Sequence, residues 1–197
     1  MKLTHRFNEA LVYAAGLHAR QNRKGTDIPY VSHLLAVASL VLEHGGNEDE
    51  AIAALLHDAI EDQAQHNGGA EALRQRIREK FDDAVVDIVD GCSDADTHPK
   101  PEWRGRKEKY IAHLRTASSS VRLVAAADKL HNARAVLRDY QLLGDDLWAR
   151  FNPEAGKEGS LWFYREVVKA LRVVDSSPLV DELDRVVTEL EKSALRN

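Results

Sequence analysis

The segment from Val121 to Leu137 constrains the fold of this chain more than any other, because it leaves few positions for water. Eleven of its seventeen residues are valine, leucine or alanine, and they do not keep to one side of a helix. A helix that is apolar nearly all round must be surrounded by other elements. The segment therefore predicts a central helix with further elements packed around it.

The rest of the chain repeats apolar residues at helical spacing and offers no convincing alternating strand. The helical segments expected besides the central one are residues 7–21, 31–42, 47–62, 70–80, 83–90, 103–116, 161–171 and 178–190. Polar stretches rich in Pro and Gly at residues 93–102 and 140–159 are expected to be long loops. We predict an all-α, single-domain bundle of about eight to ten helices spanning residues 1–197.

Composition agrees with one globular domain. The 197 residues are 44% hydrophobic and 30% charged, as in ordinary soluble proteins, and one domain of this length can bury a substantial core. A formal net charge of −5 provides no global field for nucleic acid, so none is expected as a partner. An anionic substrate would need a local basic pocket or a metal ion.

The single cysteine, Cys92, rules out a disulfide within the chain and a structural zinc site built on several thiolates. It favours a reducing cytoplasm. The sequence shows no signal peptide and no apolar run long enough to span a membrane, so we expect a cytoplasmic protein without a membrane partner. It leaves a homo-oligomer open.

Four ionisable residues close the apolar segment that begins at Ala53: His57, Asp58, Glu61 and Asp62. On one continuous helix they would share a side of the last turns, because His57 and Glu61, like Asp58 and Asp62, are four residues apart. Carboxylates at the negative end of a helix dipole are unfavourable unless a cation balances them. A solvated helix face is the alternative, and this stretch alone does not decide between the two.

Two other polar residues lie among apolar helix positions. Asp128 lies within the central helix, where a buried carboxylate without a partner would be costly, and His131 and Asn132 lie one turn further along. His33 lies between apolar positions of the segment 31–42; a lone histidine there is more often a hydrogen-bonded core residue than a ligand.

Together, His33, His57, Asp58 and Asp128 would offer two imidazoles and two carboxylates without a thiolate. This donor set suits a divalent ion such as Mn²⁺, with Fe²⁺ or Mg²⁺ as alternatives, better than structural zinc. Neighbouring residues on a helix point about 100° apart, so the adjacent pair can converge only on an ion in a groove between helices.

The chain resembles the HD-domain metal-dependent phosphohydrolases, and within them the hydrolase domain of the RelA/SpoT homologues and the stand-alone small alarmone hydrolases. The matching segments, in chain order, are Arg23-Lys24-Gly25, Pro29-Tyr30-Val31-Ser32-His33, His57-Asp58-Ala59-Ile60-Glu61-Asp62 and Ala127-Asp128-Lys129-Leu130-His131-Asn132-Ala133-Arg134. The chain departs from the usual pattern at Leu34, where the family usually has proline, and at Ala135, where many members have threonine.

The resemblance implies an HD-type bundle with its metal site in the centre and an activity: hydrolysis of the 3′-pyrophosphate of (p)ppGpp to GDP or GTP and pyrophosphate. It implies that Glu61 and Asp62 orient and deprotonate the attacking water, and that Arg23, Lys24 and Asn132 bind the nucleotide. The alternatives are an HD hydrolase acting on another nucleotide (ppApp, the 2′-phosphate of NADPH or a nucleoside 5′-monophosphate), or a non-catalytic nucleotide-binding regulator.

Two further segments, residues 104–109 and 157–164, resemble parts of the bacterial stand-alone members, without assigned contacts. The first, from Arg104 to Lys109, is the most basic stretch of the chain. It is interpreted either as a solvated face or as the frame of an anion site.

Overall fold

The computed structural model describes residues 2–95, 97, 99–174 and 176–195. Within these ranges the chain forms ten α-helices and two 3₁₀ helices without a strand, as the sequence predicts, and an isolated bridge pairs Asn22 with Pro29. The elements are α1 (His5–Leu17), α2 (Val31–Glu43), α3 (Glu48–Leu56), α4 (Ala59–Gln63), η1 (Ala64–Asn67), α5 (Ala70–Phe81), α6 (Asp83–Cys92), α7 (Trp103–Leu114), α8 (Ser119–Leu143), η2 (Gly144–Arg150), α9 (Gly156–Arg172) and α10 (Pro178–Leu195).

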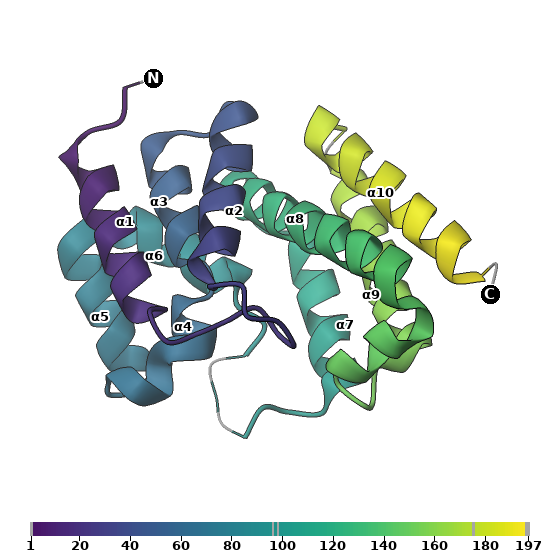
Figure 1. Ribbon diagram of the computed structural model, residues 1–197. Coiled ribbons are helices and arrows are strands. Elements are labelled where there is room, and N and C mark those ends of the chain that lie inside the picture. The colour runs from purple at the N-terminus through teal and green to yellow at the C-terminus, as the bar shows by residue number, and fades with distance from the viewer. Residues whose placement is uncertain (1, 96, 98, 175, 196–197) are drawn as a thin grey trace.

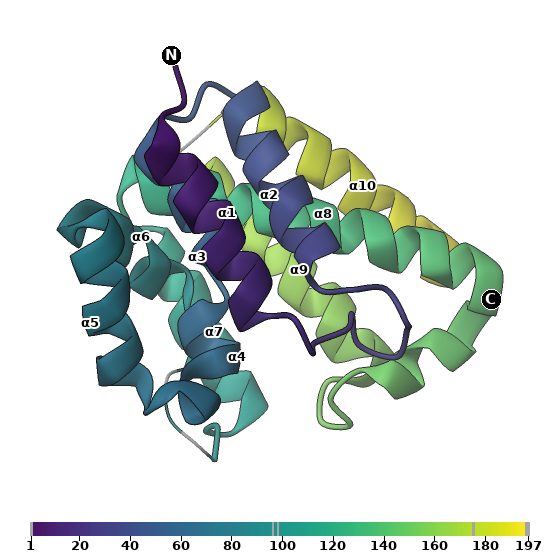
Figure 2. The ribbon, with the colours of Figure 1, turned by 60° about the vertical axis from the view of Figure 1, so that its left-hand side comes forward.

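Helix α8 is the predicted central element. It packs against α2, α3, α6, α9 and α10, and in Figures 1 and 2 it runs across the molecule between the group α1–α6 and the pair α9–α10. The consecutive small residues from Ala125 to Ala127 are almost fully buried, which lets neighbouring helices approach its axis closely. Its buried carboxylate, Asp128, therefore lies inside the bundle.

Several helix ends follow from local sequence signals. Asn47 and Glu50 form a capping box at the start of α3, each side chain accepting from the other residue's backbone N–H. Pro178 opens α10 after Ser177. The cap of α8 is Ser118, whose hydroxyl accepts from the N–H of Val121.

The prediction of a long loop at residues 140–159 is wrong for most of that segment. Helix α8 continues to Leu143, the 3₁₀ helix η2 follows, and α9 begins at Gly156. The Trp148 ring is buried against Tyr140, and Asp145 accepts hydrogen bonds from both side chains, which fixes the turn at the end of α8. The region from 93 to 102 lies between α6 and α7, as expected, apart from positions 96 and 98, which lie outside the described residues.

The single helix expected over residues 47–62 is also wrong. Helix α3 ends at Leu56 and α4 starts at Ala59, so His57 and Asp58 form a turn between two helices. Asp58 has φ −97° and ψ 0°, in the bridge region where regular helical geometry is interrupted. The hydrophobic pattern does not reveal this break because both flanking segments are helical.

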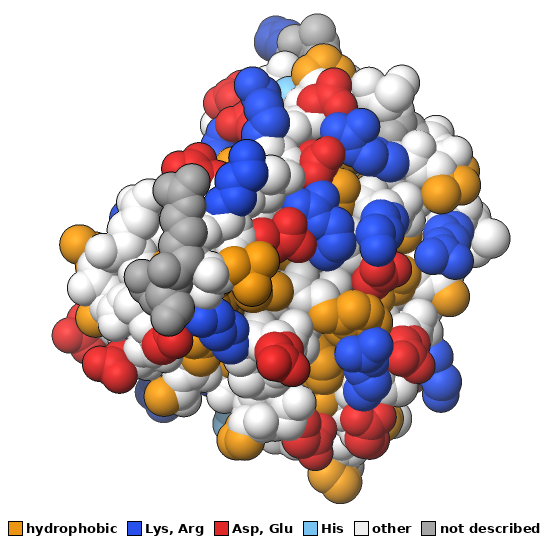
Figure 3. Space-filling view, turned by 90° about the vertical axis from the view of Figure 1, so that its right-hand side faces the viewer, with side chains coloured by type: hydrophobic (Ala, Val, Ile, Leu, Met, Phe, Trp, Pro, Cys, Tyr) orange, Lys and Arg blue, Asp and Glu red, His pale blue; other side chains and the backbone are white. Residues whose placement is uncertain are grey.

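The face of the molecule that carries α9 and α10 has charges of both signs, and Figure 3 shows Lys and Arg side chains intermixed with Asp and Glu. Arg165 pairs with Asp184 and Glu191, and Arg172 pairs with Asp181 and Asp184. Among the described helices, none combines the length and the apolar character that crossing a bilayer requires.

Candidate metal centre and nucleotide cavity

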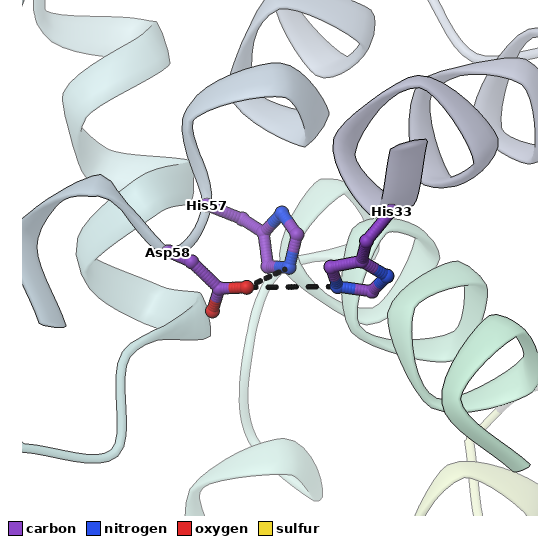
Figure 4. Close-up of side chains that lie close together, drawn as sticks. All are labelled: His33, His57 and Asp58. Atoms are coloured by element: carbon purple, nitrogen blue, oxygen red, sulfur yellow. Dashed lines mark ion pairs between the residues drawn. The ribbon is translucent and has the colours of Figure 1, made fainter. Parts of the chain in front are cut away.

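Three elements bring the expected metal ligands together. His33 comes from the first turn of α2, and His57 and Asp58 come from the turn between α3 and α4. These residues offer ligand atoms that all lie within 4.8 Å of one another. Figure 4 shows both imidazole rings and the carboxylate directed toward one point. The Nε2 atom of His57 lies 2.9 Å from Asp58 Oδ2, and that of His33 lies 3.5 Å from the same oxygen.

Asp128, the fourth expected ligand, reaches the same place from α8. Its Oδ1 atom lies 3.2 Å from His33 Nε2 and 3.7 Å from His57 Nε2. The helix break at His57 and Asp58 directs two neighbouring side chains to one point, the groove geometry that adjacent ligands need. The cluster can therefore hold an ion between α2, the α3–α4 turn and α8.

The nitrogen atoms of this cluster fit a metal ion. The Nε2 atoms of His33 and His57 are buried and have no hydrogen-bond partner among the described residues, although carboxylate oxygens lie within 4 Å of them. Buried polar atoms normally have a partner, and two such atoms facing one point are rare in a purely structural site. A cation at that point would satisfy both nitrogens.

The other ring nitrogen of each histidine is held from behind. His57 Nδ1 donates to the Ala54 carbonyl at 2.8 Å, and His33 Nδ1 shares a hydrogen bond of 2.8 Å with His131 Nδ1. Partners of this kind fix the tautomer that leaves Nε2 free to bind a metal. The hydrogen bond of His57 also ties the turn after α3 to the preceding helix.

The two carboxylates are oriented in the same way. The Tyr30 hydroxyl donates to Asp58 Oδ2 at 2.5 Å. Lys129 donates to Asp128 Oδ2, and the Asn132 amide donates to Asp128 Oδ1. Lys129 thus occupies the oxygen that faces away from the histidines and leaves Oδ1 beside them.

The field of this cluster favours positive charge. Burial lowers the pKa of His57, but the charge of Asp58 and the nearby Asp128 carboxylate outweigh it and raise that pKa well above its usual value. Burial raises the pKa of Asp128, but the charge of Lys129 and the two nearby imidazoles outweigh it and hold that pKa well below its usual value. Potentials that draw a proton to an imidazole also draw a divalent cation.

Glu61 and Asp62 follow the metal pair on α4 and point to different neighbours. Glu61 accepts from Lys100 Nζ at 2.6 Å, and it lines a small cavity of about 110 Å³ together with Asp58, Asp128 and Lys129. Burial, with the nearby charge of Asp94, raises the pKa of Glu61. Glu61 therefore shares a cavity with two of the expected ligands.

Asp62 lies in the wall of a different cavity, of about 600 Å³. Its Oδ2 atom accepts from the Gln21 side chain at 2.8 Å. Burial, followed by the charge of Asp58, raises the pKa of Asp62. The two carboxylates thus line two different cavities rather than one helix face, which corrects the expectation of a shared face.

Arg23, Lys24 and Asn132 line one cavity of about 600 Å³, together with Asp62 and His131. The residues from Gln21 to Tyr30 form a tight loop in which backbone bonds join Arg23 to Ile28 and Tyr30 to Gln21. Within it, the Arg23 guanidinium donates to Asn132 Oδ1 at 2.6 Å and lies 5.7 Å from the centre of the Tyr30 ring. The structure therefore brings the three predicted nucleotide-binding residues together beside the metal cluster.

The basic segment from Arg104 to Lys109 has two different faces. Arg104 is half exposed and lies over the Trp162 ring, 3.2 Å from its centre. Arg106 and Lys107 are largely buried and pair with Asp94. Burial raises the pKa of Asp94, but the charges and hydrogen bonds of Lys107 and Arg106 lower it to about 2.

Sequence reasoning assigned no role to the residues that position the site. Tyr30, Lys129 and His131 hold three of the ligands, while Lys100 and Gln21 hold Glu61 and Asp62. Tyr30, three residues before His33, and Lys129, next to Asp128, could have been suspected from spacing. Lys100 and Gln21 are about forty positions from their partners and carry no such signal.

Comparison with known proteins gives a consistent result. A family model described as "HD domain" matches residues 10–160. The guanosine-3′,5′-bis(diphosphate) 3′-pyrophosphohydrolase MESH1 of Xenopus tropicalis is 35% identical over 171 residues, which cover 85% of this chain and 86% of that protein. A protein of Brucella ovis named GTP pyrophosphokinase rsh is 32% identical over 94% of this chain, which spans 25% of its length.

Solved structures agree. A structure described as a metazoan orthologue of SpoT that hydrolyses ppGpp superposes with a TM-score of 0.76 at 26% identity, covering 96% of this chain and 97% of that one. The lmo0812 protein of Listeria monocytogenes gives a TM-score of 0.69 at 28% identity, covering 81% and 99%. With its helical bundle, its clustered histidines and aspartates and these matches, the chain belongs to the HD-domain family.

Proposed function

We propose that this protein is a metal-dependent hydrolase that removes the 3′-pyrophosphate of (p)ppGpp and releases GDP or GTP and pyrophosphate. The observation that carries the proposal is the juxtaposition of the His33, His57, Asp58 and Asp128 cluster with a cavity lined by Arg23, Lys24 and Asn132. The MESH1 relative of Xenopus tropicalis, matched over most of both chains, carries this activity in its name.

The four clustered residues would hold one divalent ion, which we propose to be Mn²⁺, with Fe²⁺ or Mg²⁺ as alternatives. When bound, such an ion polarises a phosphoryl oxygen and lowers the pKa of a neighbouring water. Tyr30 and Lys129 would keep Asp58 and Asp128 in place during this chemistry, because each donates a hydrogen bond to one of these carboxylates.

Glu61 and Asp62 are proposed to orient the attacking water and take its proton. Their pKa values are raised by burial and by neighbouring carboxylates, which brings a carboxylate closer to the pKa that a general base needs at neutral pH. The Lys100 ammonium and the Gln21 amide hold the two side chains in place.

Arg23 and Lys24 are proposed to bind the nucleotide. Arg23 can stack on a base or hydrogen bond to phosphate through its planar guanidinium, whereas Lys24 supplies a point charge. Asn132 would contact the sugar or base, and its amide already bonds to Asp128. Asn132 would thereby link the position of the nucleotide to the position of the metal ligand Asp128.

We further propose that residues 1–197 form one domain, that the protein acts in the cytoplasm on a small nucleotide without nucleic acid or a membrane as partner, and that a homo-oligomer is compatible with this activity. Hydrolysis of another nucleotide remains the alternative, because the names of the relatives state the substrate of those proteins and not of this one. A non-catalytic regulator is disfavoured, since every expected ligand and both carboxylates are present.

A substrate panel tests the proposal. Purified protein with Mn²⁺ is incubated with ppGpp, pppGpp, ppApp, NADPH and deoxynucleoside monophosphates, and products are identified by ion-exchange chromatography. We expect the highest kcat/KM for ppGpp or pppGpp, with pyrophosphate as the leaving product. A higher kcat/KM for NADPH or a monophosphate, with release of orthophosphate, would show that the proposed substrate is wrong. No turnover of any compound would favour a non-catalytic nucleotide-binding regulator.

A further inference from the structure

Gln21 lies at the end of the segment that follows α1 and contacts both halves of the site. Its backbone carbonyl accepts from the Tyr30 N–H at 2.8 Å, which closes the base of the loop carrying Arg23 and Lys24. Its side-chain Nε2 donates to Asp62 Oδ2 at 2.8 Å. One residue thus joins the nucleotide-binding loop to a proposed general base.

The orientation of the Gln21 amide is fixed by its other partners. Its Oε1 atom accepts from Gln63 Nε2 at 2.5 Å and lies 2.7 Å from His18 Nδ1. An ionised carboxylate can only accept, so the NH₂ group must face Asp62 and the oxygen must face the two other side chains. His18 is almost fully buried and stacks on the Tyr30 ring, with centroids 5.2 Å apart.

The Gln21–Asp62 pair also forms a wall between two cavities. Both residues line the cavity of about 600 Å³ that contains Arg23 and Lys24. Both also line a second hollow, of about 860 Å³, next to Tyr13 and His66. Without the hydrogen bond, the Asp62 carboxylate would be free to turn toward the second hollow and away from the cluster.

We propose that Gln21 is a positioning residue for Asp62: its amide holds the carboxylate on the side of the metal cluster, and His18 and Gln63 hold the amide. This inference rests on the proposed function, because it assigns Gln21 a role through Asp62. It goes beyond that function by naming a residue that touches neither metal ligands nor, in this proposal, the reacting atoms.

The test compares Gln21→Leu and Gln21→Glu with Asp62→Asn, using ppGpp as substrate. Leucine removes the donor at nearly the same size, and glutamate keeps the oxygen that His18 and Gln63 contact but loses the donor to Asp62. We expect kcat to fall about 10- to 100-fold in each Gln21 variant, as for loss of a hydrogen bond to a charged group. KM and metal stoichiometry should stay within about twofold and the helical circular dichroism should be unchanged.

The double variant Gln21→Leu/Asp62→Asn gives the sharpest readout. If Gln21 acts through Asp62, the double variant should be no slower than Asp62→Asn alone, because residues that act as a unit are not additive. The exposed Gln75→Leu on α5 is the matched control and should retain wild-type kinetics.

Several results would overturn the inference. A Gln21→Glu enzyme with wild-type kcat, a raised KM at unchanged kcat, or full additivity in the double variant would each make Gln21 a scaffold or binding residue. A wild-type rate in Asp62→Asn would remove the base on which the inference rests. A wild-type protein that does not hydrolyse ppGpp would instead refute the proposed function, before any variant is compared.

Discussion

The metal cluster and the nucleotide cavity are built differently. The cluster takes its side chains from α2, from α8 and from the turn between α3 and α4; His33, His57 and Asp128 are nearly inaccessible, and each has a second partner behind it. The cavity is lined in part by the loop between α1 and α2, which contributes Arg23 and Lys24, and in part by residues of α8 and η2. A rigid cluster suits a metal ion that stays bound, and an open cavity suits a substrate that enters and leaves.

Substitutions in the metal cluster should have the largest effect on activity and metal binding. Replacing His57 by Ala should abolish measurable hydrolysis and reduce metal affinity by more than about 100-fold, because even partners outside the coordination sphere typically contribute 10- to 100-fold. Metal analysis after dialysis, beside kcat, checks this. A His57→Ala protein that keeps one tightly bound ion per chain would show that the cluster is not the binding site.

A smaller, purely kinetic effect is expected next to the cluster. The double replacement Glu61→Gln and Asp62→Asn should lower kcat about 10²- to 10⁴-fold, as for loss of a general base, while the ion stays bound. Single variants would rank the two carboxylates, since Glu61 and Asp62 line different cavities. Loss of metal in the double variant would make these residues ligands, and a near wild-type kcat would exclude them from the mechanism.

Tyr30→Phe removes only the hydroxyl that donates to Asp58. We expect metal affinity to fall about 10- to 100-fold, as for other partners of a ligating carboxylate, and activity to recover at saturating Mn²⁺. A Mn²⁺ titration of activity measures both. If activity stayed low at saturating Mn²⁺, Tyr30 would act on the nucleotide from the cavity and would not support the metal cluster.

The smallest effect is expected in the loop. Arg23→Ala and Lys24→Ala should each raise KM for the nucleotide roughly tenfold and leave kcat and metal content unchanged, the pattern of lost uniform binding. The exposed Lys192→Ala on α10, which does not line the cavity of Arg23 and Lys24, serves as the control for removal of a lysine charge. Unchanged kinetics in both loop variants would make that loop an ordinary solvated turn.

The sequence predicted the helices, and the residues that lie together in the cluster, better than the directions of the side chains. Periodicity located α2 and α8, and the order of the motifs identified residues that the structure brings together, because apolar spacing and ligand type are local properties. The break at His57 and Asp58 was missed, since the helices on both sides continue the same pattern. That break is what directs two adjacent side chains to one point.

The divergence of Glu61 and Asp62 could not be predicted for a related reason. Their directions depend on Lys100 and Gln21, which come from distant segments and meet α4 only in the folded chain. The prediction of a loop after Tyr140 was wrong because the glycines and the proline of that segment indicated irregular structure. In the folded chain the buried Trp148 ring organises η2 instead.

One measurement tests the central claim most directly. Protein stripped of metal with a chelator is titrated with Mn²⁺ while bound metal and pyrophosphate release from ppGpp are followed together. The account predicts that activity returns in proportion to the first ion bound, with saturation at one ion per chain and with GDP and pyrophosphate as products. Activity without metal uptake, or uptake of one ion without pyrophosphate release from ppGpp, would contradict it.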